Sequence, residues 1–316
     1  MHPAYSVIFF TVSSGAGYGL MFVLGLAVPL DAIPASRGGS AAASLLALTL
    51  VVGGLLSSTA HLGHKLRAWR AISQWRSSWL SREGVFALAS LPVFTLFALG
   101  WVFAPDSFWW RPLAPLSAAL AALTVCATAM IYASLKPIRQ WHNAYVLPIY
   151  LAFGLGSGLM LLNLVLSIDG TAIAWTAQYG LIALAAAVGL KLLYWRAVDS
   201  EAPVTGIGTA TGLGRFGRVR SLDPPHTSEN YLLKEMGYRV ARKHAERLRR
   251  AMLVLVFAAP TLLTLGALGL YSLPAVEALL ASLAAIAMTA GLLLERWLFF
   301  AEATHTVQLY YGAERS

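Results

Sequence analysis

The sequence has little charge and almost no cysteine. Charged residues make up 12% of the 316 residues, whereas soluble domains carry about 25%. The single cysteine, Cys126, cannot form a disulfide or hold an iron–sulfur cluster alone, and we interpret it as a small packing residue. Gly212, Gly214 and Gly217 have dinucleotide-loop spacing, but no strand is predicted before them. These features argue against a nucleotide-binding loop and against a cysteine-held redox cluster.

Long apolar blocks replace the missing charge. Hydrophobic residues make up 58% of the chain, and a helix of about 20 such residues spans a bilayer core of about 30 Å. Eight blocks reach this length: residues 5–30, 41–61, 84–104, 114–134, 146–168, 173–195, 251–272 and 276–300. They do not alternate as membrane strands do. The sequence therefore predicts an all-α polytopic membrane protein, a bundle of eight transmembrane helices.

The basic residues gather in alternate loops. The region 191–250 holds 12 of the 23 Lys and Arg residues, and the loops 62–83 and 135–145 hold seven more. The opposite loops hold only Arg37 and Arg111. The positive-inside rule predicts that both termini and the basic loops face the cytoplasm of a bacterial inner (plasma) membrane. The net charge of +9 therefore indicates orientation and no nucleic-acid partner.

The predicted spans divide the chain into three parts. Residues 1–195 contain the first six spans, and residues 251–316 contain the last two. Between them, residues 196–250 begin with a segment rich in Gly, Pro, Ser and Thr and end with helical spacing. Because a loop of this size often binds a partner, we predict that it is cytoplasmic and docks a partner subunit.

A polar segment joins the second and third predicted spans. Within it we predict a helix over residues 64–82 in the lipid headgroup layer, because one face is aromatic and the other basic. The aromatic face consists of Trp69, Ile72, Trp75 and Trp79, and the basic face includes Arg67 and Arg70. His61 and Glu83 flank this helix at span ends. An interfacial anchor alone does not account for these two residues.

A second group of ionisable residues ends the last predicted span. It consists of Glu295, Arg296, Glu302 and His305. Ionisable residues at membrane depth are costly and often mark pathways or ligand sites. Glu295 and Glu302 share one helix face, and His305 follows one turn later. An interfacial ion pair between Glu295 and Arg296 is the simpler alternative.

These residue types suit a quinone. A quinone needs lipid for its tail, hydrogen-bond donors for its carbonyls and groups that exchange protons, and histidine titrates near neutral pH. A haem would need two histidines that face each other inside the bundle. Of the seven histidines, only His61 and His305 lie near span ends, and none lies in mid-span. We therefore expect a quinone, menaquinone or ubiquinone, and neither a haem nor a metal site.

The chain resembles the anchor-subunit family of dimethyl sulfoxide reductase over nearly its whole length, in the segments HPAYSVIFFTVSSGAGYGL, HLGHKLRAWRAISQWRSSWLSRE, MIYASLKPIRQWHN and ERWLFFAEATHTVQLYYG. The resemblance implies eight helices without haem and binding of menaquinol. It also implies a molybdopterin catalytic subunit and a four-cluster iron–sulfur subunit as partners, which hold those cofactors. The quinol-site motif of the family matches His61, Gly63, Arg67 and Glu83. Contacts around the ring or along the tail are expected from Trp69, Arg70, Trp75, Trp79, Glu295, Glu302 and His305.

The resemblance leaves the direction of electron transfer open. The 196–250 loop also resembles that of cytoplasmic sulfite dehydrogenase anchors in the same family, in which electrons run from sulfite to quinone. A secondary transporter would need ionisable or helix-breaking residues near mid-membrane, where this chain has mostly Leu, Ala, Val and Gly. A scaffold without a ligand would leave His61 and Glu83 unexplained. The sequence favours a quinone-binding anchor in a respiratory electron transport chain.

Overall fold

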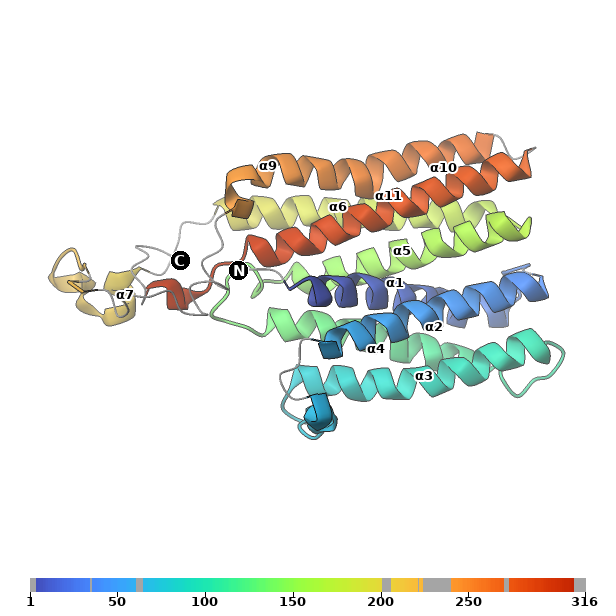
Figure 1. The fold of residues 1–316 in the computed structure, drawn as a ribbon, viewed down its shortest axis with the longest axis horizontal. Coiled ribbons are helices and arrows are strands. Elements are labelled where there is room, and N and C mark those ends of the chain that lie inside the picture. The colour runs from blue at the N-terminus through green and yellow to red at the C-terminus, as the bar shows by residue number, and fades with distance from the viewer. Residues whose placement is uncertain are drawn as a thin grey trace.

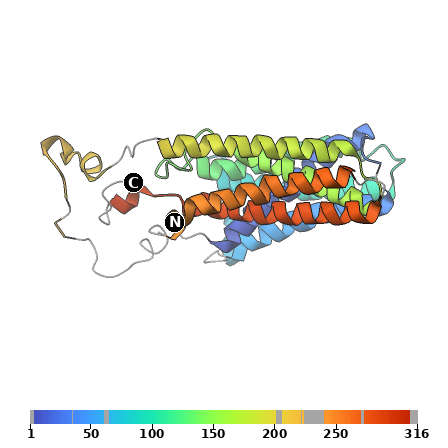
Figure 2. The same ribbon diagram turned by 90° about the horizontal axis from the view of Figure 1, so that it is seen from above.

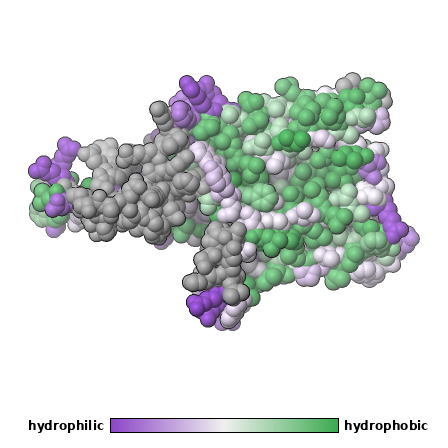
Figure 3. All heavy atoms as spheres, in the orientation of Figure 1, coloured by the Kyte–Doolittle hydropathy of each residue, from purple (hydrophilic) through white to green (hydrophobic). Residues whose placement is uncertain are grey.

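The computed structural model describes residues 4–34, 36–60, 65–200, 206–220, 222–223, 240–269 and 273–309. Within these ranges, eight helices are long and apolar enough to span a membrane. They run side by side along the long axis of the molecule (Figure 1). Apolar side chains cover the sides of the bundle, and polar side chains gather toward its ends (Figure 3). The predicted all-α polytopic membrane fold is confirmed.

Six single helices form the first six spans. They are α1 (Tyr5–Ala27), which the short 3₁₀ helix η1 (Val28–Leu30) extends, α2 (Arg37–Ala60), α3 (Trp79–Phe103), α4 (Leu113–Ala133), α5 (Val146–Asp169) and α6 (Ala174–Ser200). The third span begins at Trp79 and not at residue 84, because Ser78 caps it. The Ser78 hydroxyl accepts a hydrogen bond from the Ser81 N–H at 3.4 Å, which satisfies a donor of the first helical turn.

The seventh span consists of three helical pieces that join end to end, and the eighth is a single helix. The pieces are α9 (Val240–Leu253), the π-helical turn η4 (Val254–Ala258) and α10 (Ala259–Gly269), and the eighth span is α11 (Pro274–Ala301). Pro260 has no N–H to donate to the Val256 carbonyl, and the π turn absorbs this misfit. A Cβ on Gly291 of α11 would lie 2.6 Å from the Val256 nitrogen. The glycine therefore lets α11 pack tightly against the turn.

Helix α1 forms the centre of the bundle. It packs against α2, α4, α5 and α11, and 78% of its most apolar window is buried. Its closest approach is to α5, where a Cβ on Gly19 would lie 1.8 Å from the Gly154 carbonyl oxygen. Small residues allow helices in a membrane to approach this closely. The α1–α5 contact is thus a backbone-to-backbone crossing.

The two ends of the bundle differ. Both Tyr5 and Leu309 lie at one end, together with the connection 134–145 and the 3₁₀ helix η2 (Lys65–Ile72) (Figures 1 and 2). We call this the proximal end and the opposite one the distal end. The short helices α7 (Ile207–Thr211) and η3 (Leu213–Phe216) project beyond the proximal end (Figure 1).

The segment predicted as one interfacial helix over residues 64–82 is divided. Helix η2 ends at Ile72, a turn follows, and α3 begins at Trp79. Arg82 causes this break, because its guanidinium donates hydrogen bonds to the Trp75 carbonyl at 3.0 Å and to the Arg76 carbonyl at 2.8 Å. The turn is thereby folded back onto α3. Trp69 and Trp75 are exposed here, as expected of aromatics in the headgroup layer.

Candidate ligand site

Four ionisable residues are buried within the spans near the proximal end. Counted along each helix at 1.5 Å per residue, they lie roughly 6 to 14 Å inside that end. Their exposed fractions are 5% for Glu83, 1% for Lys191, 0% for Glu295 and 5% for Arg296. Buried charge at membrane depth usually belongs to a pathway or a ligand site. The four residues therefore define the candidate site.

Glu83 of α3 lies against Thr128 of α4. The Thr128 hydroxyl contacts the Glu83 carboxyl and lies 3.0 Å from the Thr124 carbonyl oxygen. Because a hydroxyl carries one proton, Thr128 donates to an ionised Glu83, or donates to Thr124 and accepts from a protonated Glu83. Among the described residues, no cation pairs with Glu83. The pair can thus take up or release a proton when one hydroxyl rotates.

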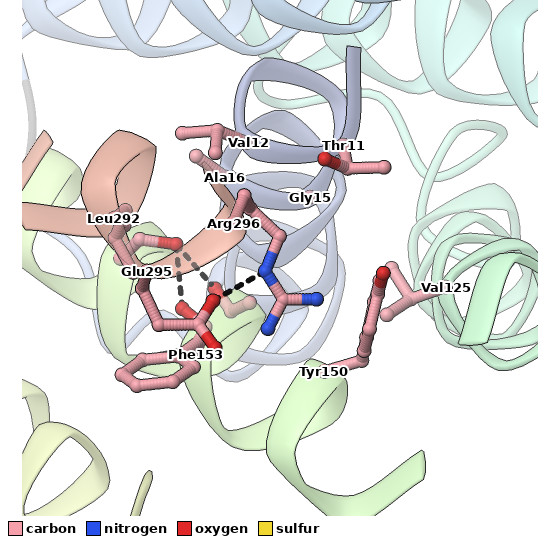
Figure 4. Close-up of a pocket in the computed structure, with 12 residues that line it drawn as sticks. Thr11, Val12, Gly15, Ala16, Val125, Tyr150, Phe153, Leu292, Glu295 and Arg296 are labelled. Carbon is pink, nitrogen blue, oxygen red and sulfur yellow. Dashed lines mark hydrogen bonds and ion pairs between the residues drawn. The ribbon is translucent and has the colours of Figure 1, made fainter. Parts of the chain in front are cut away.

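Glu295 of α11 lies between two cations. The Lys191 Nζ is 2.6 Å from its Oε1, and the Arg296 Nε contacts its Oε2 (Figure 4). Aromatic rings surround the cations: the Arg296 Cζ lies 4.0 Å from the centroid of the Tyr150 ring, and the Lys191 Nζ lies 4.4 Å from that of Tyr194. Such contacts stabilise buried cations. With one anion and two cations, this cluster is positively charged.

A small cavity adjoins the cluster between α1, α4, α5 and α11. Its free volume of about 30 Å³ is enough for about one water molecule. Figure 4 shows the Arg296 guanidinium directed toward Tyr150 across this space. The Arg296 Nη1 has no hydrogen-bond partner among the described residues, and the Tyr150 hydroxyl has no acceptor there. Buried donors normally have partners, so an oxygen of a ligand or of water suits this cavity.

A second ionic group ties the helix ends together. Arg249 of α9 donates to Asp199 of α6 at 2.5 Å and to Glu302 at 2.8 Å. Burial lowers the pKa of His305, and its Nδ1 accepts a hydrogen bond from the Val307 N–H at 2.9 Å. Both Glu302 and His305 thus have partners at the proximal surface. They support the site and do not line the cavity.

The predicted site residues lie in different surroundings. Glu83 is buried in the bundle, whereas Arg67 and Arg70 are exposed on η2. No hydrogen bond or ion pair between Arg67 and Glu83 is present in the described parts of the chain. Trp79 is half-buried at the start of α3. His61 and Gly63 lie outside the described residues.

Sequence reasoning missed three residues of the site and misplaced one pair. Lys191 was counted as a charge that sets orientation, and Tyr150 and Thr128 were hidden in apolar blocks. The simpler alternative of an interfacial Glu295–Arg296 pair is wrong, because both side chains are buried and Lys191 completes the group. The available signal was Lys191 itself, a lone lysine within an otherwise apolar span.

Comparison with known proteins covers the whole bundle. The chain matches a family model described as DMSO reductase anchor subunit (DmsC) over residues 1–312. It is also 34% identical to a subunit of the sulfite dehydrogenase of Allochromatium vinosum over 342 aligned residues, which cover 98% of this chain and 99% of that protein. Both similarities extend through every span and through the segment that contains His61 and Glu83.

Proposed function

Because this chain belongs to the DMSO reductase anchor subunit family, we propose that it exchanges electrons with a membrane quinone for the oxidoreductase complex that it anchors. The buried Glu83–Thr128 pair carries the proposal, since it places a proton-exchanging acid within reach of the lipid phase. A quinol supplies two electrons and two protons when it is oxidised. The positive cluster at Arg296 adds donors for its oxygens.

The residues divide the work as follows in this proposal. Glu83 passes protons between the quinone oxygen and the proximal surface. His61 donates a hydrogen bond to one oxygen, and Gly63 leaves room for the ring. Arg67, exposed on η2, lies where the ring enters from the headgroup layer. The exposed tryptophans Trp69 and Trp75 border that entrance.

We assign the partner subunits to the proximal end. The electrons pass to or from a four-cluster iron–sulfur subunit, which connects to a molybdopterin catalytic subunit. The polar segments at this end, η2, the connection 134–145 and the described part of 206–223, form the docking surface, while lipid covers the sides (Figure 3). The similarity to a sulfite dehydrogenase subunit favours electron flow from sulfite to quinone as the second candidate. The potentials of the partners set this direction.

Glu83→Gln tests the proton-exchange role. Glutamine keeps the shape of the side chain but cannot release a proton, and a lost hydrogen bond to a charged group costs about 1.5–3 kcal/mol. We expect quinone-linked turnover of the assembled complex to fall about ten- to a hundredfold. Turnover with a soluble artificial electron carrier should remain. Both rates are measured on the purified complex.

Glu246→Gln is the matched control, because Glu246 is exposed on α9 at the same end. It should leave both rates unchanged. Normal quinone-linked turnover in Glu83→Gln would place the quinone elsewhere. Loss of both rates would show that Glu83 holds the complex together and does not act on quinone.

The orientation of the bundle follows from its charges. The proximal connections carry most of the basic residues, so this end should face the cytoplasm. A phosphatase that is active only in the periplasm should be inactive when fused at Asp223 and active when fused at Asp106 in the distal connection. The reverse pattern of activities would place both termini in the periplasm.

A further inference from the structure

Three hollows adjoin along one face of α1. The first is the small cavity at Arg296. The second, of about 290 Å³, lies between α1, α4 and α5 and shares Val125 and Gly154 with the first. The third, of about 830 Å³, lies between α1, α5 and α6 and shares Phe22 and Leu155 with the second. We call the three together the α1 groove.

The spacing of its α1 residues shows that the groove follows the helix. It is lined in turn by Thr11, Gly15, Tyr18, Phe22 and Leu26. Steps of three and four residues keep to one helix face. From Thr11 to Leu26 the axial length is roughly 22 Å at 1.5 Å per residue, most of a hydrocarbon core of about 30 Å. The groove therefore runs from the buried cluster toward the distal end.

The lining changes from polar to apolar along this length. At the proximal end are the unpartnered Arg296 Nη1 and the Tyr150 hydroxyl without an acceptor. The second hollow is bordered by Tyr18, which is buried and whose hydroxyl has no acceptor among the described residues. The Glu83 carboxyl interacts electrostatically with this hydroxyl. Polar atoms thus face the inner end of the groove.

The third hollow is almost wholly hydrocarbon. It opens on the lipid-facing side, where Leu26 is 45% exposed and Ile182 is 61% exposed. None of its lining residues is charged. A ligand that fills the groove must therefore have a small polar end inside the bundle and a long apolar chain that leads to lipid.

These features distinguish an isoprenoid quinone from a phospholipid. A phospholipid headgroup is large and charged and stays at the membrane surface, where the distal mouth offers it no cation. A quinone ring has two small oxygens that accept hydrogen bonds, as the buried donors require. The volume of the second hollow suits a ring, and that of the first suits a bridging water to Arg296.

We propose that the α1 groove binds the quinone, with its ring beside Tyr18 in the second hollow and its isoprenoid tail along α1, α5 and α6. This inference rests on the proposed function. It adds Tyr18 as the donor to one ring oxygen and assigns the distal apolar hollow to the tail. Neither role was expected from the sequence motif around His61.

The tail is tested with two neighbouring alanines of α6. Ala186 is exposed and lines the third hollow, whereas Ala185 is exposed and does not line it. Ala186→Trp should fill the hollow and raise KM about tenfold for a long-tailed quinone, since displaced chain carbons lose their burial. KM for a short-tailed analogue should not change. Ala185→Trp should leave both values unchanged.

The ring is tested with Tyr18→Phe, which removes one hydroxyl and keeps the aromatic ring. It should raise KM about tenfold for both the long- and the short-tailed quinone, while turnover with a soluble carrier remains. Tyr145→Phe, at the proximal end outside the groove, is the control. Unchanged KM for both substrates in Tyr18→Phe would overturn the assignment of the ring.

Other outcomes separate the two proposals. If the unmodified complex turns over quinone but Ala186→Trp treats both tails alike, the groove assignment fails and the proposed function stands. If Ala186→Trp releases a co-purified phospholipid, detected by mass spectrometry, and leaves quinone kinetics unchanged, the occupant is that lipid and the inference is overturned. If the unmodified complex reacts with no quinone, the proposed function itself fails.

Discussion

Glu295→Gln is expected to remove most of the folded subunit from the membrane. The Glu295 side chain is fully buried and is the anion between Lys191 and Arg296. Glutamine would leave two neighbouring cations without an anion in an apolar interior. Removal of one partner from a buried ion pair costs about 3–5 kcal/mol, which is roughly two to three orders of magnitude in the folding equilibrium.

The net charge of the cluster predicts an unequal result for its two partners. Lys191→Met leaves a neutral Glu295–Arg296 pair and should cost less, about 1–3 kcal/mol for the unsatisfied carboxylate oxygen. The double variant Lys191→Met with Glu295→Gln leaves one unpaired cation. It should therefore be more stable than Glu295→Gln alone, although it carries more changes.

Stability is measured as the amount of monodisperse subunit recovered in mild detergent and as its thermal unfolding midpoint. The control is Glu277→Gln in the first turn of the same helix, which lies at the distal end and has no role in the cluster. It should lose at most a few tenths of a kcal/mol from the helix dipole. Equal losses in Lys191→Met and Glu295→Gln would contradict the charge argument.

The spans could be predicted because hydropathy is a local property. Each of the eight apolar blocks became a membrane-spanning helix. Their ends moved where a specific side chain intervenes. Ser78 caps α3 several residues before the apolar run begins, and Arg82 folds the preceding turn back onto the helix. The π turn before Pro260 follows from a missing N–H, a signal that was present in the sequence and was not used.

The site was only partly predictable, because its partners are far apart in the chain. Glu83 was identified from its motif, but its partner Thr128 is 45 residues away on another helix. Lys191 and Glu295 are separated by 104 residues and meet only because α6 and α11 end at the same side of the bundle. Side-chain periodicity assigns a residue to a face. It does not say which face of which other helix lies opposite.

The close contact between α1 and α5 gives the second large effect. In Gly19→Ala, the new Cβ would lie 1.8 Å from the Gly154 carbonyl oxygen, which is backbone and cannot turn aside. The helices must separate, and α1 also packs against α2, α4 and α11. Overpacking costs about 1–3 kcal/mol and occasionally more, and a clash with backbone lies at the upper end. We expect little assembled subunit and a lower unfolding midpoint.

Gly53→Ala is the matched control, because a Cβ at Gly53 of α2 would meet no atom within 4 Å. There the same chemical change should raise stability by about 0.4–1 kcal/mol, since alanine restricts the unfolded chain and favours a helix. The two variants should thus move the unfolding midpoint in opposite directions. A Gly19→Ala subunit as stable as the unmodified one would mean that α1 and α5 lie farther apart than described, and the α1 groove beside this crossing would then be wider and less selective for one chain.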